Sequence, residues 1–328
     1  MTANEITFSI RLPNSGPYTS SDAVREVALL ADELGFEALT VHDHIPRSRK
    51  QNWHFSAGSV DDVKENQAPD LFEAMTALTF AAGLTKRIKL CPTGIVLPLR
   101  DPLLLAKQSA TLHVLSGGRF ILGLAIGASR DEFEILGVPF RERGKRTDEY
   151  LEVIRRVFDE APFASADGPN VKFSNAEFFP KPANLPIWIC GKVEASMRRV
   201  ARYGHCFLPA GFSVDLYREK LKLLHEVLDR EGRPRAEILC GLETFITVRE
   251  EEGAADRDAT STLTHWYGGL EKGKESNFIG TPEGISERIA RYVELGVRHF
   301  ELKFITRGLA DQLEMMRLIA AEIAPKFA

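Results

Sequence analysis

The chain has 328 residues, of which 27% are charged and 44% are apolar, a composition typical of a globular protein with a large core. Its formal net charge of −4 excludes a strongly basic nucleic-acid-binding or membrane surface, and no apolar run reaches the length of about 18 residues that predicts a membrane helix. The amino-terminal residues lack the basic and apolar regions of a signal peptide, so we expect a cytoplasmic protein.

The first clear structural unit begins with a serine, at position 20 or 21, that can cap a helix. Apolar residues recur at helical spacing over 20–34, Gly35 is a plausible left-handed end, and 37–42 is typical of a short buried strand. The same order of helix, glycine and strand returns over 282–303. This alternation is what a parallel sheet requires.

Counting such units along the chain predicts a closed barrel. Strands are expected near 5–12, 37–42, 87–95, 118–125, 186–190, 204–209, 236–247 and 297–303. Helices are expected near 20–34, 70–84, 101–115, 131–159 with a break at 137–144, 192–202, 212–230, 282–295 and 308–325. Eight strands and eight helical segments predict an α/β fold, a single (β/α)8 TIM barrel over residues 1–328.

Three stretches, 43–69, 160–185 and 248–281, do not fit the repeating unit. The first and third follow strands, so we expect these insertions at the C-terminal mouth of the barrel, where barrel enzymes keep their sites. The middle stretch contains VKFSNAEFF, which predicts a short hairpin. No linker divides the chain into independent domains.

The four cysteines stand far apart and form no C-x-x-C pair. A chain of this length needs no disulfide framework, and the spacing of zinc ligands is absent. We therefore expect the cysteines to serve as small apolar residues in or near strands. They are Cys91, Cys190, Cys206 and Cys240.

Polar residues at the end of the second predicted strand form a candidate site. His42, Asp43 and His44 are three titratable groups at the mouth of a barrel, and the loop after them carries Trp53 and His54, which we expect to line a substrate pocket with His42. The alternative is that these three residues form a polar strand end whose side chains only make hydrogen bonds to neighbouring loops. His-x-His also occurs in dinuclear metal hydrolases, but the other strand ends lack further His and Asp ligands, so no metal site is predicted.

Three more strand ends are candidates for cofactor binding. A glycine there permits close approach to the backbone, although it can also form a simple bulge. The junction after the fifth strand combines backbone N–H groups, a helix dipole and a lysine, which together favour binding of an anion. The alternative interpretation of these residues is a tight turn with a solvated lysine. The three junctions are Thr93-Gly94-Ile95, Gly127-Ala128 and Gly191-Lys192-Val193.

Three longer stretches together resemble the bacterial luciferase-like superfamily. They are LPLRDPLLLAKQSATLHVLSGGRF and its continuation over 97–158, LPIWICGKVEASMRRVARYGHCFLPAG, and IGTPEGISERIARYVELGVRHFELKF. The resemblance implies a barrel that holds a flavin, or the deazaflavin coenzyme F-420, across its strand ends.

The resemblance also implies roles for individual residues. In the F-420-dependent branch an acid and a histidine follow strand two, and Asp43-His44 match them. Asp43 would bond the edge of the cofactor ring, and His44 would act as a catalytic proton donor or polariser near its hydride-transfer face. Relatives often have a non-proline cis peptide at the end of strand three, for which Gly94-Ile95 is the matching place.

The remaining matches concern the cofactor phosphate and the substrate. Gly191 and Lys192 correspond to the region near that phosphate. Ala128 stands where some sugar-phosphate-oxidising relatives have a catalytic glutamate, which argues against the same alcohol oxidation.

These implications favour an F-420-dependent oxidoreductase that transfers a hydride to or from a small organic substrate. The alternative is a reduced-FMN-dependent two-component monooxygenase, supplied by a separate cofactor reductase, whose dry pocket must protect the oxygenated flavin. A non-catalytic flavin-binding protein and a metal-dependent barrel hydrolase are weaker alternatives. A homodimer is the oligomeric state that the resemblance implies.

Overall fold

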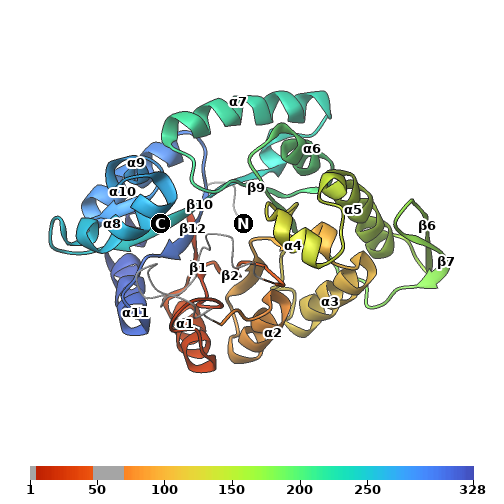
Figure 1. The fold of residues 1–328 in the computed structure, drawn as a ribbon, viewed down its shortest axis with the longest axis horizontal. Coiled ribbons are helices and arrows are strands. Elements are labelled where there is room, and N and C mark those ends of the chain that lie inside the picture. The colour runs from red at the N-terminus through yellow and green to blue at the C-terminus, as the bar shows by residue number, and fades with distance from the viewer. Residues whose placement is uncertain (1–4, 47–69) are drawn as a thin grey trace.

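The computed structural model describes residues 5–46 and 70–328, and within them parallel strands form a ring that helices surround (Figure 1). Neighbouring strands follow the order β3-β2-β1-β12-β10-β9-β8-β5-β4. Backbone hydrogen bonds between Leu90 and the segment before β5 bring the two ends of this order together, with 2.9 Å from the Ile121 nitrogen to the Leu90 oxygen. The strands are β1 (Thr7–Arg11), β2 (Ala38–Val41), β3 (Lys89–Pro92), β4 (Ile95–Val96), β5 (Leu122–Ala125), β8 (Ile187–Cys190), β9 (Cys206–Leu208), β10 (Leu239–Val248) and β12 (His299–Phe304).

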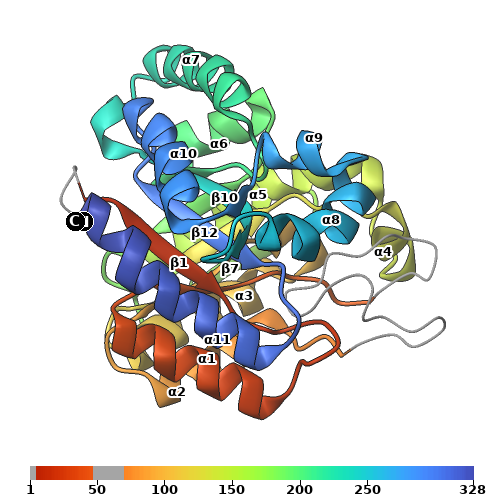
Figure 2. The ribbon, with the colours of Figure 1, turned by 90° about the vertical axis from the view of Figure 1, so that its left-hand side faces the viewer.

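Because β3 and β4 are two parts of one barrel position, the ring has the eight positions of a TIM barrel, and the predicted fold is confirmed. Figure 2 shows α1 and α11 side by side along β1. The helices that cover the barrel are α1 (Ser21–Leu34), α2 (Ala74–Leu84), α3 (Pro102–Leu115), α4 (Arg130–Ile135), α5 (Arg143–Asp159), α6 (Glu194–Tyr203), α7 (Val214–Arg230), α10 (Pro282–Glu294) and α11 (Leu309–Leu318).

The local signals read from the sequence act as expected in α1. The Ser20 hydroxyl accepts a hydrogen bond from the Ala23 N–H at 3.0 Å, and Gly35 ends the helix at φ 79° in the left-handed region. No helix in the described parts of the chain is long and apolar enough to span a bilayer.

The third stretch that did not fit the repeating unit folds into elements that were not predicted. It forms α8 (Ala254–Tyr267), α9 (Leu270–Lys274) and β11 (Phe278–Gly280), which pairs with the end of β10. The buried side of α8 consists of small or polar residues with one leucine, so the sequence shows little of the apolar periodicity that predicts a helix.

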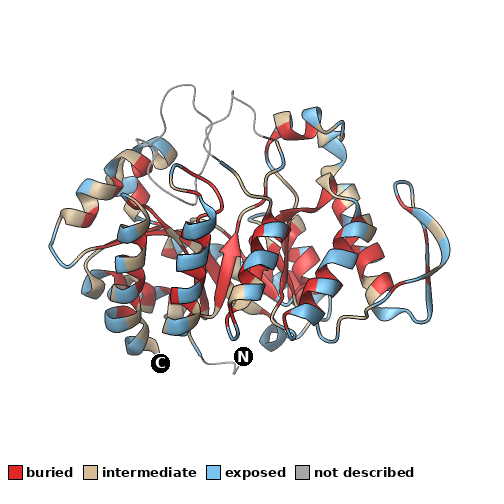
Figure 3. Ribbon diagram, turned by 90° about the horizontal axis from the view of Figure 1, so that it is seen from below, coloured by how far each residue is buried: buried red, intermediate tan, exposed pale blue. Residues whose placement is uncertain are grey.

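The middle stretch contains the predicted hairpin, β6 (Phe163–Asp167) paired with β7 (Lys172–Glu177). It extends from the barrel, and most of its residues are exposed or half-buried (Figure 3). Most of the first stretch, including Trp53 and His54, lies outside the described residues.

Side chains alternate between the helices and the interior of the barrel. On β1, Phe8 and Ile10 pack in the main core under the helices, as period-two alternation requires. Trp188 on β8 and His299 on β12 contact each other with ring centroids 4.8 Å apart, although their strands are not neighbours, so they meet inside the barrel. The apolar part of this interior consists of Cys91, Ile121, Trp188, Cys206 and Leu208. All four cysteines are free and lie on strands, which confirms their predicted positions.

The break between β3 and β4 contains a cis peptide bond between Thr93 and Gly94. The expected place, Gly94-Ile95, was wrong by one bond. The Thr93 N–H still donates to the Val41 carbonyl at 2.8 Å, so regular strand pairing continues through Thr93 and ends immediately after it.

Candidate active site

The strand ends bring most of the predicted site residues to one mouth of the barrel. A Cβ atom on Gly94 would lie 3.0 Å from the Cys190 sulfur, and one on Gly127 would lie 2.6 Å from the Val96 side chain. The ends of β4, β5 and β8 therefore approach closely because glycines stand between them. Gly127 requires this residue type for a second reason, since its φ of 80° lies in the left-handed region. Ile95 is fully buried on β4, whereas Ala128 is exposed just beyond β5.

His42 is held by the protein at both ring nitrogens. Its Nδ1 lies 3.3 Å from Arg11 Nη1, and its Nε2 lies 2.9 Å from the Ser15 hydroxyl. Because a guanidinium can only donate, Nδ1 is the acceptor, and the neutral ring carries its proton on Nε2. His42 therefore belongs to the supporting structure of the mouth.

His44 has a different partner. Its ring lies 5.7 Å from that of His42, and its Nδ1 is 3.0 Å from Glu132 Oε2. Glu132 Oε1 accepts the Ile45 N–H at 2.8 Å, and only 1% of the Glu132 side chain is exposed. A carboxylate can only accept, so Nδ1 of His44 carries the proton. The His44 side chain is 30% exposed, which leaves part of the ring accessible from the mouth.

Asp43 stands between the two histidines in the sequence, and its side chain is fully buried. One carboxylate oxygen accepts the Val96 N–H at 2.9 Å, and the other is bound by Arg100, which also bonds Glu73 at 3.0 Å. Burial raises the pKa of Asp43, and Arg100 offsets this only in part. In this structure the carboxylate fastens the segment after β2 to β4 and the turn after it. Its predicted bond to a cofactor ring stays a prediction.

A buried carboxylate accepts hydrogen bonds from residues on β1, on β2 and in the break after β3. Glu301 Oε1 accepts from Arg11 Nε at 2.7 Å, from the Thr40 hydroxyl at 2.8 Å and from the Thr93 hydroxyl at 3.0 Å. Arg11 also donates to Thr93 at 3.1 Å. The other oxygen of Glu301 is buried and forms no hydrogen bond within the described residues.

Glu243 and Lys303 continue this group of charges towards the opening. Lys303 forms a 2.6 Å ion pair with Glu243 and lies 4.3 Å from the centre of the Phe245 ring. Arg11 reaches Glu243 at 3.6 Å. We call this cluster the floor network, and its members are Arg11, Thr40, Thr93, Glu243, Glu301 and Lys303.

The two acids of the floor network differ in pKa. Burial raises the pKa of Glu301 to about 7, because Arg11 compensates only part of the lost hydration and Glu243 adds a like charge. Burial acts in the same direction on Glu243, but Lys303 and Arg11 outweigh it and lower its pKa to about 2. As pH rises, Glu243 therefore loses its proton before Glu301 does.

The fifth barrel strand contributes the predicted anion junction at the rim. Lys192 and Val193 are exposed, and no side chain caps α6, which begins after them. The Lys192 amine lies 5.9 Å from the centre of the Phe212 ring. Although its surface is exposed, enough protein surrounds the amine that burial, together with the nearby Lys303, lowers its pKa. Lys192 forms no ion pair with another described residue.

Several functional candidates were not found from the sequence. His299, Glu301 and Lys303 alternate with large apolar residues in HFELKF, so three polar side chains share one face of β12. That alternation was a readable signal of a polar barrel interior. Glu132 stands in a capping pattern with Ser129, which gives no indication of its contact with His44.

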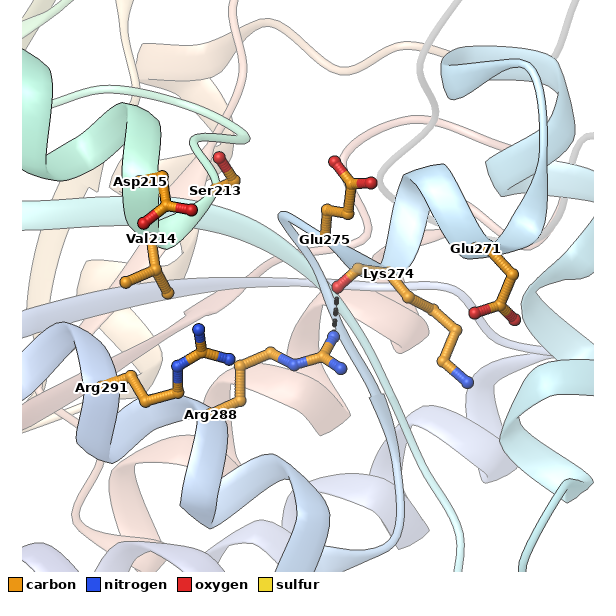
Figure 4. Close-up of a pocket in the computed structure, with 8 residues that line it drawn as sticks. All are labelled: Ser213, Val214, Asp215, Glu271, Lys274, Glu275, Arg288 and Arg291. Atoms are coloured by element: carbon orange, nitrogen blue, oxygen red, sulfur yellow. Dashed lines mark hydrogen bonds between the residues drawn. The ribbon is translucent and has the colours of Figure 1, made fainter.

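A separate cavity of about 320 Å³ lies between the start of α7, α9 and α10 (Figure 4). Arg288 donates to the Asn277 carbonyl at 2.6 Å and also binds the Lys274 carbonyl, while Lys274 pairs with Asp256 at 2.8 Å. These cations already have partners, and acidic side chains are as numerous as basic ones around the cavity. It is lined by Ser213, Val214, Asp215, Glu271, Lys274, Glu275, Arg288 and Arg291. Within residues 5–46 and 70–328, no group of three or more His, Cys, Asp or Glu side chains could hold a metal ion.

Comparison with known proteins gives a consistent family. The family model described as luciferase-like monooxygenase matches residues 6–299. An F-420-dependent glucose-6-phosphate dehydrogenase of Microbacterium testaceum is 26% identical over 335 residues, which cover 92% of each chain.

Solved structures with the same fold include enzymes named for different cofactors. An F-420-dependent secondary alcohol dehydrogenase, in complex with an F-420-acetone adduct, superposes with a TM-score of 0.82, 17% identity and 99% coverage of both chains. The oxygenating constituent of 3,6-diketocamphane monooxygenase from Pseudomonas putida, in complex with FMN, gives a TM-score of 0.78, 17% identity and 99% coverage of both chains.

Proposed function

The chain belongs to the luciferase-like monooxygenase family, and from this membership we propose that it is an oxidoreductase that transfers a hydride between coenzyme F-420 and a small organic substrate. The observation that carries the proposal is the Asp43-His44 pair at the end of β2, where His44 is partly exposed and oriented by a buried carboxylate. Relatives named as F-420-dependent match this chain over nearly its whole length.

The residues at the mouth fit such a cofactor. Glycines let the segments at β4, β5 and β8 pack closely, because a Cβ atom on Gly94 or Gly127 would meet neighbouring protein atoms, and this close packing would form a backbone wall against which a planar ring could lie. Thr93, Gly94, Gly127 and Ala128 would form this wall, while Ile95 is fully buried on β4. Lys192 lacks an ion-pair partner among the described residues and stands beside the uncapped start of α6. With Gly191 and Val193 it would hold a phosphate, because a cation and a helix N-terminus both favour negative charge.

When bound, the deazaflavin supplies a ring carbon that carries or accepts a hydride. The protein must then manage the proton that accompanies the hydride. With Nδ1–H bound to Glu132, the nitrogen of His44 that can accept or release a proton is Nε2. Oxidation of a substrate hydroxyl would deliver its proton to this nitrogen, and reduction of a carbonyl would draw it from there. In the floor network, Arg11 pairs with Glu301 and Lys303 pairs with Glu243, so these charged side chains would not need water near the reacting groups for hydration.

Titration of the purified protein with F-420 and with FMN, each oxidised and reduced and followed by fluorescence, tests the proposal. We expect micromolar binding of F-420 and weak binding of FMN. Preference for reduced FMN would replace the proposal with the two-component monooxygenase and its separate reductase. Binding without turnover with any donor would indicate a flavin-binding protein, and failure of both cofactors would remove the assignment and make metal analysis the next step.

His44→Ala tests the catalytic role within the same function. Turnover should fall by about 10²-fold to 10⁴-fold, because general acid–base catalysis is lost, while the Kd for F-420 stays nearly unchanged. Equal loss of binding and turnover would contradict this role. The homodimeric state, the small-molecule substrate and the cytoplasmic location expected from the sequence belong to the same proposal.

A further inference from the structure

Glu132 reaches His44 across 88 positions of the chain. It stands at the third position of α4, after the helix-capping Ser129, whose hydroxyl accepts the Glu132 N–H at 3.2 Å. In a capping box, a glutamate at this position turns back to the start of its own helix. The Glu132 carboxylate instead binds the segment after β2, with one oxygen on the His44 ring and the other on the Ile45 N–H.

The position of this carboxylate is costly without its partners. A buried carboxylate loses hydration and needs hydrogen bonds or an opposite charge to compensate. Among the described residues, no lysine or arginine forms an ion pair with Glu132, and His44 is the ionisable group that it contacts. The buried carboxylate of Glu132 therefore acts mainly on the imidazole ring of His44.

The two histidines of the mouth are consequently fixed in opposite tautomers. Arg11 and Ser15 place the proton of His42 on Nε2, and both of its nitrogens are bound within the protein. Glu132 places the proton of His44 on Nδ1. The second arrangement makes Nε2 the nitrogen at which His44 can exchange a proton.

We propose that Glu132 is a positioning residue that holds His44 in the Nδ1–H tautomer and so selects Nε2 for proton transfer. The inference rests on the proposed function only in the identity of His44 as the proton-transfer group. Glu132 itself contacts neither substrate nor cofactor in this role, and it acts through the orientation of the ring, as carboxylates do beside catalytic histidines.

Nitrogen NMR of the cofactor-free protein labelled with ¹⁵N in its histidines tests the geometry directly. The His44 signals are assigned by their absence in His44→Gln. We expect the wild-type protein to show a protonated Nδ1 and an unprotonated Nε2 at His44 when the ring is neutral. Glu132→Gln should change this pattern, because an amide has one acceptor oxygen for two donors. Glu134→Gln, an exposed neighbour on α4, should leave it unchanged.

Kinetics with the cofactor that binds separate positioning from a purely structural role. Glu132→Gln should lower kcat by at least about 10-fold, while KM and the Kd of the cofactor change by less than about 2-fold. Equal losses in Glu132→Gln and in Glu134→Gln, or a parallel loss of cofactor binding, would overturn the proposal.

The wild-type spectrum keeps the proposal falsifiable even if Glu132→Gln does not fold. A proton on Nε2 of neutral His44 in the wild-type protein would overturn it without any variant. The spectrum requires no cofactor, so this failure is distinct from failure of the proposed function. Loss of the F-420 assignment with the Nδ1–H tautomer intact would overturn the proposed function alone.

Discussion

Replacement of Asp43 separates its observed structural contacts from the cofactor contact that family resemblance implies. The Asp43 side chain is fully buried, and its two oxygens hold the Val96 N–H and the Arg100 guanidinium. Asp43→Ala removes both acceptors at once, whereas Asp43→Asn keeps an acceptor for Val96 and removes the charge. Glu73→Gln is the matched control, because Glu73 is the other carboxylate on Arg100 and its side chain is 37% exposed.

The magnitudes follow from burial. Removing one member of a buried ion pair costs about 3–5 kcal/mol, and Asp43→Ala should lie near the low end because Glu73 still accompanies Arg100. Asp43→Asn should lower the free energy of unfolding by about 1.5–3 kcal/mol, the value of a hydrogen bond to a charged group. Glu73→Gln should cost about 1 kcal/mol, since its pair with Arg100 is close to solvent and the amide keeps one acceptor oxygen for the Thr76 N–H that Glu73 caps at the start of α2.

Chemical denaturation of the four proteins without cofactor, followed by circular dichroism, gives these free energies. The expected order of stability is wild type, Glu73→Gln, Asp43→Asn and Asp43→Ala. The reasoning is refuted if both Asp43 variants unfold at the wild-type denaturant concentration. If they also lose F-420 binding, the carboxylate serves the cofactor rather than the turn after β4.

Two further outcomes concern the barrel itself. Gly123→Ala should reduce the yield of folded protein sharply, because its Cβ would lie 1.8 Å from the Pro92 oxygen. The control Gly83→Ala in α2 meets no atom within 4 Å and should raise the free energy of unfolding by about 0.5–1 kcal/mol. Comparable unfolding midpoints for the two variants would contradict this expectation. Burial, with a smaller effect of Lys89, lowers the pKa of His299 from 6.5 to about 3. Between these two pH values the unfolded chain binds a proton at His299 and the folded protein does not. The free energy of unfolding therefore falls as pH decreases from 6.5 to about 3, by up to about 1.4 kcal/mol per pH unit. Denaturation at several pH values should show a shallower decline for His299→Gln, and equal slopes would exclude His299 as the group responsible.

The barrel could be predicted because its signals are local. A capping serine, an apolar stripe and a left-handed glycine define α1, and a strand follows each such unit. The region of α8 could not be predicted in the same way, because its buried side is formed largely by small residues such as Ala255 and Ala259. Such a helix is stabilised by contacts with β10 and β11 that are distant in sequence.

The candidate site was predictable only where chemistry and strand ends coincide. His44 could be found because it follows a strand, but Glu132 could not, since its contact depends on how α4 lies over the mouth. Arg11 and Glu301 are 290 positions apart and meet because β1 and β12 are neighbours in the closed ring. A sequence pattern can place each of them on an inward face, but only the closed barrel pairs them.

The two sides of the mouth differ in character, and this difference links the fold to the proposed chemistry. Glycines bring the segments at β4, β5 and β8 close together, whereas β1, β10 and β12 carry Arg11, Glu243, Glu301 and Lys303. Burial raises the pKa of Glu301, whereas Lys303 and Arg11 lower the pKa of Glu243, so a proton taken up by the floor network resides on Glu301 rather than on Glu243. Under the proposed function, this charged side would be the part of the mouth that meets the charge of a bound redox cofactor.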